Sequence, residues 1–115
     1  MTFKTINANQ LKQIENNGII LDVRTQMEHV EKHLKCKHIH IPLDELSPSD
    51  FIAKNNINEN TSIYILCHIG KRAIQAALKF DFENYPNIYV IEGGIVACED
   101  CGHEMAGYNA KILPH

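Results

Sequence analysis

A cysteine followed by a glycine and two cations is the part of this sequence best suited to chemistry. The segment reads Cys67-His68-Ile69-Gly70-Lys71-Arg72. Gly70 permits a positive φ, so a short loop here can curl until successive N–H groups point at one centre. Lys71 and Arg72 add positive charge, and such surroundings favour the thiolate form of a cysteine. The pattern predicts an anion-binding loop with a nucleophilic sulfur at its mouth; the alternative is that Cys67 is a buried structural cysteine.

Two regular elements are expected to hold this loop. Residues 63–66 form an apolar, β-branched and aromatic run, which is typical of a strand buried on both faces. After the loop, apolar residues recur at helical spacing at Ala73, Ala76, Ala77 and Phe80. The loop is therefore predicted to be a strand-to-helix turn, where ligands bind in an open α/β sheet. The amino end of the helix adds about half a positive charge.

Two further strand ends should lie at the same edge of the sheet. Asp22 and Arg24 follow an apolar strand at residues 19–21. We expect them to form a structural ion pair that supports the cysteine loop; direct contact with a ligand is the alternative. Residues 92–94 read Glu-Gly-Gly and predict a second tight turn, after a buried strand at residues 88–91.

The rest of the chain alternates short strands and helices, which predicts an α/β sandwich with a mainly parallel sheet. Further strands are expected at residues 4–6 and within 36–42. A first helix is expected to begin at Asn7 or Asn9 and to end near residue 18, and a helical turn is expected at 28–35. A third helix is expected at 48–54, capped by Ser47 or Ser49, and a fourth begins at Ile95. Connectors are expected at 43–46, 55–60 and 81–87, with a weakly patterned tail at 102–115 that contacts the core through Ile112 and Leu113.

Composition narrows the class of protein. At 115 residues, the chain is expected to form one domain over 1–115, and 44% hydrophobic and 22% charged residues are ordinary for a globular protein. A net charge of −3 argues against a general nucleic-acid binder. No apolar stretch approaches the roughly 18 residues of a membrane span. Four cysteines without a visible secretory signal predict a reducing compartment, the cytoplasm.

These segments together resemble the rhodanese-like domain, in its single-domain sulfurtransferase form. The resemblance implies a three-layer sandwich with a mainly parallel, five-stranded sheet flanked by helices. Departures from the family pattern at Lys32, Cys36-Lys37 and Cys98 lie outside the cysteine loop. The matching segments keep the family's order over nearly the whole chain: Leu21-Asp22-Val23-Arg24, Glu28 and His33, Ile41-Pro42-Leu43, residues 67–72, and residues 92–97.

The resemblance also implies a thiosulfate sulfurtransferase. Cys67 would take the outer sulfur of a small donor such as thiosulfate, hold it as a persulfide and pass it to cyanide, a thiol or a sulfur-accepting protein. Asp22 and Arg24 would support the loop. No cofactor, metal, nucleic acid or membrane is expected as a partner. The loop that would cradle the persulfide consists of His68, Ile69, Gly70, Lys71 and Arg72, and Arg72 would shape it by pairing with a carboxylate. Lys71 and His68 can attract an anionic donor; the alternative for His68 is a solvent-facing side chain without an essential role.

Two other functions remain open. Cysteine phosphatases and arsenate reductases place five residues between the cysteine and arginine, which makes a wider cradle, whereas four separate Cys67 from Arg72. A binding or regulatory module would use the fold without turnover, although inactive members of the family usually lack the cysteine.

A second group of thiols allows several interpretations. Cys98 and Cys101 form a Cys-x-x-Cys pair followed by His103, and Cys36 is expected to pack nearby. Zinc binding, a resolving thiol, a disulfide and a purely structural role are the alternatives. The remaining histidines outside the loop are predicted to be surface or structural residues, namely His29, His33, His40 and His115, while His38 is placed with His40 on one face of a strand.

Overall fold

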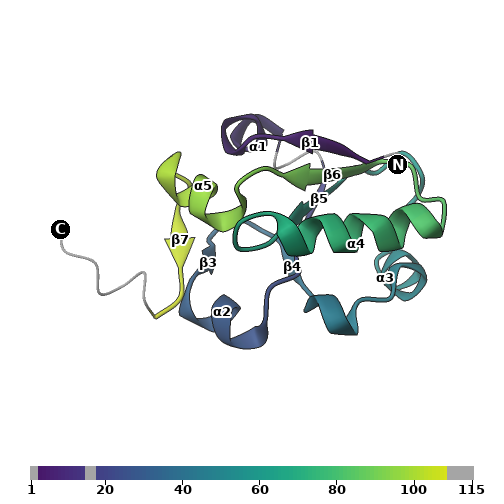
Figure 1. Ribbon diagram of the computed structural model, residues 1–115, viewed down its shortest axis with the longest axis horizontal. Coiled ribbons are helices and arrows are strands. Elements are labelled where there is room, and N and C mark those ends of the chain that lie inside the picture. Colours follow the sequence, from purple (N-terminus) through teal and green to yellow (C-terminus); the bar gives the residue numbers. More distant parts are fainter. Residues whose placement is uncertain (1–2, 15–17, 109–115) are drawn as a thin grey trace.

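A sheet of five parallel strands runs through the molecule in the order β1-β6-β5-β2-β4 (Figure 1). The computed structural model describes residues 3–14 and 18–108. Because all neighbouring strands are parallel, their carboxyl ends lie at one edge, with β5 in the middle. The strands are β1 (Lys4–Ile6), β2 (Ile19–Asp22), β4 (Ile39–His40), β5 (Ile63–Leu66) and β6 (Ile88–Ile91).

Helices cover both faces of the sheet and enclose a core on each side. Successive strand residues point to opposite faces, so Ile63 and Ile65 enter one core while Tyr64 and Leu66 enter the other. These layers of helix, sheet and helix confirm the expected α/β sandwich. The first core is closed by α3 (Pro48–Lys54) and α4 (Lys71–Phe82), and the second by α1 (Ala8–Ile14) and α5 (Gly94–Asp100).

The segment predicted as a helical turn at 28–35 is divided into two elements. Helix α2 (Gln26–Glu31) begins earlier because Thr25 and Glu28 form a capping box, in which each side chain accepts the other residue's backbone N–H. Strand β3 (His33–Leu34) follows and pairs antiparallel with β7 (Met105–Ala106).

The small β3–β7 sheet was not expected from the sequence. Two-residue strands are too short to show alternation, and their pairing depends on bringing residues far apart in the chain together. Helix α4 also extends to Phe82, two residues into the expected connector at 81–87. The proposed core contact of Ile112 and Leu113 lies outside the described residues. No helix in the described part is long and apolar enough to cross a membrane.

The turn at Gly94 packs directly on the cysteine loop. Gly94 has a φ of 59°, and a Cβ on it would overlap the carbonyl oxygens of Cys67 and His68, well inside the 3.0 Å that Cβ atoms keep from other heavy atoms. The N–H groups of Ile95 and Val96 donate to these same two oxygens, at 2.8 and 3.4 Å. Glycine is therefore required for α5 to begin against the loop.

We predict that Gly94→Ala lowers the free energy of unfolding by roughly 2–4 kcal/mol, since it combines an unfavourable φ with backbone overlap. Gly102→Ala is the matched control. Gly102 has a φ of 88°, but its added Cβ would meet only the flexible end of Lys12, at 3.3 Å. That variant should lose about 1 kcal/mol. Urea denaturation followed by circular dichroism measures both; equal losses would contradict the packing argument.

Candidate active site

Cys67 lies immediately beyond β5, at the central carboxyl end of the sheet, and its sulfur faces the loop. The backbone N–H of Gly70 donates to Cys67 Sγ at an N···S distance of 2.9 Å. Gly70 has a φ of 114°, a left-handed conformation that lets α4 begin directly after this N–H. The sequence predicts that several N–H groups converge on this sulfur; within the described residues, the structure shows one such hydrogen bond, from Gly70.

The loop presents most of its side chains to solvent, while Cys67 itself is buried. His68, Ile69 and Lys71 are exposed, whereas Cys67 and Gly70 are buried. Helix α4 begins at Lys71, directly after the loop, and runs for 12 residues. The amino end of its dipole therefore lies next to Cys67 and favours an anion there.

The Arg72 guanidinium forms a bidentate ion pair with Glu28 of α2. The two guanidinium nitrogens Nη1 and Nη2 lie 2.6 and 2.8 Å from Glu28 Oε1 and Oε2. Donation by Arg72 lowers the pKa of Glu28 from 4.5 to about 2, against the opposing effect of burial. The expected pairing of Arg72 with a carboxylate is thus present, and it links α4 to α2.

Asp22 and Arg24 form a second ion pair beneath α2, and both side chains are buried. Arg24 Nε and Nη2 donate to the Asp22 carboxylate at 2.9–3.1 Å. The Arg24 guanidinium also donates to the backbone oxygens of Lys32, at 2.7 Å, and Glu28, at 3.4 Å. Arg24 thereby fixes the carboxyl end of α2 on β2, and α2 in turn presents Glu28 to Arg72.

A pocket of about 340 Å³ lies beside the loop, between α2 and α5. His68 borders it from the loop and Ile95 from α5. Lys32 and Glu99 form an ion pair at its rim, with an N···O distance of 2.9 Å. The pocket borders the loop at His68, whereas Cys67 does not line it. It is lined by Arg24, Glu28, Glu31, Lys32, His68, Ile95, Val96 and Glu99.

The second thiol group does not form a compact ligand set. Cys98 lies on the buried face of α5, and Cys36 and Cys101 are half-buried against the same core. His103 Nε2 lies 2.7 Å from the backbone oxygen of Ala8. Within residues 3–14 and 18–108, the ligand atoms of these side chains do not gather in a group of three within 4.8 Å of one another.

Four histidines meet at this end of the sheet, which the sequence did not predict. The ring of His29 stacks on those of His33 and His40, with centroids 4.3 and 4.2 Å apart, and its Nε2 lies 2.8 Å from Nε2 of His38. Burial, followed by the neighbouring imidazoles of His40 and His33, lowers the pKa of His29 to about 4. The one feature of the sequence that could have indicated this cluster is the four-residue spacing of His29 and His33, which places two imidazoles on one side of a helical turn near the end of α2.

The sequence matches the family model of the rhodanese-like domain over residues 7–101. The chain belongs to the rhodanese-like family. This rhodanese-like chain is 30% identical over 108 residues to "Uncharacterized protein RP600" of Rickettsia prowazekii (strain Madrid E), covering 88% of this chain and 85% of that protein. It is 34% identical over 76 residues to "Putative sulfur carrier protein YrkF" of Bacillus subtilis (strain 168), covering 66% of this chain. The latter match spans 38% of the Bacillus protein.

Solved structures agree with this rhodanese-like fold. A rhodanese-like domain from Anabaena superimposes with a TM-score of 0.80 over 96% of this chain and 84% of that chain, at 19% identity. A rhodanese-like domain protein from Staphylococcus aureus gives 0.66 over 88% of this chain and 96% of that chain, at 28% identity. The first likeness supports the fold alone, because identity is low.

We predict that Glu28 and Arg72 are energetically coupled in this rhodanese-like domain. A double-mutant cycle with Glu28→Gln and Arg72→Gln should give a coupling free energy of about 1 kcal/mol at neutral pH, because the pair is bidentate and half-buried. The pKa of Glu28 is about 2 when folded and 4.5 ordinarily. The carboxylate's contribution to stability is therefore full above pH 4.5 and is lost as the pH falls through 2.

Lys35 and Glu104 provide the control cycle. Their N···O distance is 3.4 Å and their side chains are 66% and 77% exposed, so their coupling should be near zero. Urea denaturation of all variants over a pH series measures both cycles. Equal coupling in the two pairs would show that Glu28 does not fasten Arg72.

Proposed function

We propose that this protein is a sulfurtransferase that carries a sulfane sulfur on Cys67. The observation that carries the proposal is the Gly70 N–H, 2.9 Å from Cys67 Sγ, at the amino end of α4. Membership of the rhodanese-like family supports it, as does similarity to a protein whose name describes a sulfur carrier. A backbone donor and a helix dipole both stabilise a thiolate, which is the nucleophilic form of cysteine.

The first step of the proposed reaction loads the enzyme. The Cys67 thiolate attacks the outer sulfur of thiosulfate, a new S–S bond forms, and the bond to the inner sulfur breaks. Sulfite leaves with that electron pair, so the enzyme holds an anionic persulfide. Loop N–H groups, the amino end of α4 and nearby cations balance the negative charge on the outer sulfur.

The second step of the proposed reaction removes the outer sulfur from Cys67. Cyanide or a thiolate attacks the outer sulfur, the S–S bond breaks, and Cys67 recovers its thiolate electron pair. A small thiol or a sulfur-accepting protein can approach through the pocket between α2 and α5. Because the sulfur is held covalently between two half-reactions, ping-pong kinetics follow. We further propose that the protein works in the cytoplasm, where thiols stay reduced.

The loop residues divide into two roles in this proposal. We assign the cradle to Gly70, whose N–H contacts the sulfur, together with the backbone of His68 and Ile69, and we assign Arg72 the role of holding its shape through Glu28. Lys71 and the side chain of His68 are exposed and attract an anionic donor. The Asp22–Arg24 pair supports the loop indirectly, by placing α2.

We predict that Cys67→Ser abolishes sulfur transfer from thiosulfate to cyanide. Serine lacks the sulfur that forms the persulfide, so the expected rate is that of the uncatalysed reaction. Mass spectrometry of the intact protein after thiosulfate treatment should show one added sulfur in the wild type and none in the variant, and peptide analysis of the wild type should place it on Cys67. Cys101→Ser, which changes a half-buried thiol elsewhere, should keep both properties.

Each outcome bears on a different alternative. Transfer that survives Cys67→Ser would contradict the mechanism. A wild-type protein that never gains sulfur would support a binding module without turnover. Cys67-dependent hydrolysis of an aryl phosphate would indicate a cysteine phosphatase instead.

We also predict that Lys71→Gln raises the KM for thiosulfate about 2- to 5-fold while kcat changes little. Loss of one exposed cation weakens attraction of a doubly charged anion by a fraction of 1 kcal/mol, and salt screens the effect. Lys54→Gln is the charge-matched control. Lys54 is the last residue of α3, where the chain returns to the amino ends of the strands, so it lies away from the cysteine loop. Steady-state kinetics at low and high ionic strength should separate the two variants, and identical behaviour would remove Lys71 from donor binding.

A further inference from the structure

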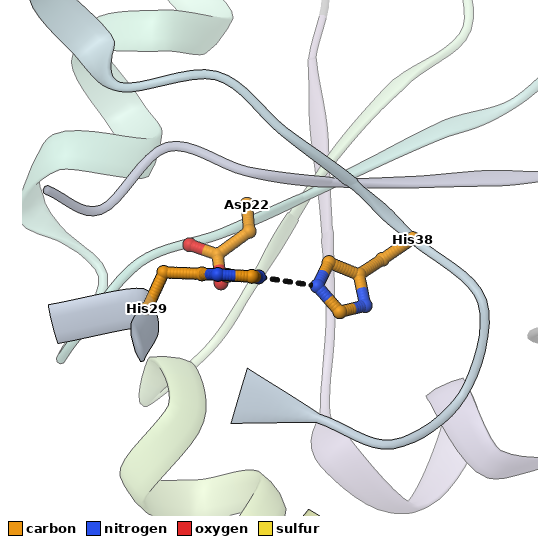
Figure 2. Close-up of side chains that lie close together, drawn as sticks. All are labelled: Asp22, His29 and His38. Atoms are coloured by element: carbon orange, nitrogen blue, oxygen red, sulfur yellow. Dashed lines mark hydrogen bonds between the residues drawn. The ribbon is translucent and has the colours of Figure 1, made fainter. Parts of the chain in front are cut away.

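Three potential metal-ligand atoms converge beside the active-site edge of the sheet, outside the cysteine loop. Asp22 ends β2, His29 lies on α2, and His38 precedes β4. One ligand atom from each lies within 4.8 Å of the other two. Figure 2 shows the two imidazoles meeting edge to edge with the Asp22 carboxylate beside His29. Within the described residues, this is the one such group of three.

From this geometry we infer that Asp22, His29 and His38 bind a divalent transition-metal ion such as Zn²⁺. Two imidazole nitrogens and a carboxylate oxygen suit zinc, cobalt, nickel and copper better than magnesium or calcium, which prefer oxygen ligands alone. The site is distinct from the proposed sulfur-transfer chemistry, in which neither histidine takes part.

The contacts of His38 leave a nitrogen available to a metal. Its Nδ1 lies 2.9 Å from the backbone oxygen of Cys36. A carbonyl oxygen can only accept, so Nδ1 carries the hydrogen, and Nε2 of the neutral ring carries a lone pair. This Nε2 is the atom directed at His29. Metal-binding histidines commonly have their other ring N–H anchored on a backbone carbonyl in this way.

His29 completes the nitrogen pair. Its Nε2 is 2.8 Å from that of His38, so in the metal-free protein His29 donates its hydrogen to the His38 lone pair. When a metal binds, the His29 hydrogen moves to Nδ1 and Nε2 becomes a ligand without any change in charge. Zn–N bonds of about 2.0–2.1 Å place two nitrogens of a tetrahedral site roughly 3.3 Å apart, so on binding the rings must separate slightly and turn until both lone pairs face the ion.

Asp22 supplies the third ligand from a fixed position. Its carboxylate accepts hydrogen bonds from Arg24 at 2.9–3.1 Å and is buried. Metal-binding carboxylates are typically held by such hydrogen bonds. His29 and His38 are only half-buried, which leaves a route for an ion and a position for water. A metal here would tie β2, α2 and the segment before β4 together.

The test uses full-length protein without a histidine tag, stripped with a chelator. Isothermal titration with Zn²⁺ should show one saturable site, and bound Zn²⁺ should raise the midpoint of thermal unfolding. His29→Gln and His38→Gln should each weaken binding by at least about 100-fold, since each removes a ligand. His68→Gln, an exposed imidazole of the loop, should retain full affinity.

Cysteines are the competing ligands, and cobalt distinguishes them. The Co²⁺ complex should show no thiolate-to-cobalt charge-transfer absorption, and Cys101→Ser should bind as the wild type does. If a histidine variant fails to fold, imidazole NMR of the wild type replaces it: Co²⁺ should broaden the signals of His29 and His38 first. Absence of saturable binding, loss of binding in Cys101→Ser alone, or unchanged affinity in both histidine variants would reduce the pair to an ordinary hydrogen bond.

Discussion

The buried ion pair of Asp22 and Arg24 is the interaction on which the arrangement of this site depends. A guanidinium without exposure to water needs a carboxylate partner and further acceptors, and the carbonyls at the end of α2 provide them. Removing either charge would leave the other buried and unpaired, which is far more costly than losing an exposed pair. Through this contact the end of β2 determines where α2 lies. Glu28 then transmits that position to Arg72 and hence to the start of α4.

The position of α2 matters both for the cysteine loop and for the group of Asp22, His29 and His38. One side of α2 carries Glu28 toward the cysteine loop, and the next residue, His29, meets His38. The loop needs α2 for the orientation of its arginine, whereas the histidine group needs it for one of its nitrogens. The proposed sulfur transfer and the proposed metal binding are therefore separable by substitution, because their reacting atoms belong to different side chains, even though one short helix positions both.

Much of the fold could be predicted from the sequence because its strands are buried and its turns carry glycine. The run at residues 63–66 and the apolar spacing from Ala73 to Phe80 place the cysteine loop between β5 and α4, as found. The 48–54 helix likewise has the expected bounds. Two-residue strands such as β3 and β7 carry no periodic pattern, so their pairing could not be seen.

The parts of the site that escaped prediction depend on tertiary proximity. The pairing of Arg72 with a carboxylate was expected, but the identity of Glu28 follows from how α2 lies on the sheet. The meeting of His29 and His38 similarly requires α2 to fold back over the segment before β4. In the sequence each histidine reads as an ordinary polar residue, and only the folded structure shows that their side chains are in contact.

The contact of Gly94 with the cysteine loop has a consequence for the direction of the loop's amides. A peptide group is planar, with its C=O and the following N–H pointing in opposite directions. Because Ile95 and Val96 hold the carbonyls of Cys67 and His68 toward α5, the next two N–H vectors are turned the other way. The Gly93-Gly94 pair, some 25 residues downstream, thus helps to orient the peptide dipoles of the cysteine loop. Substitutions near residues 93–96 would alter the electric field at the sulfur without touching any residue of its own turn.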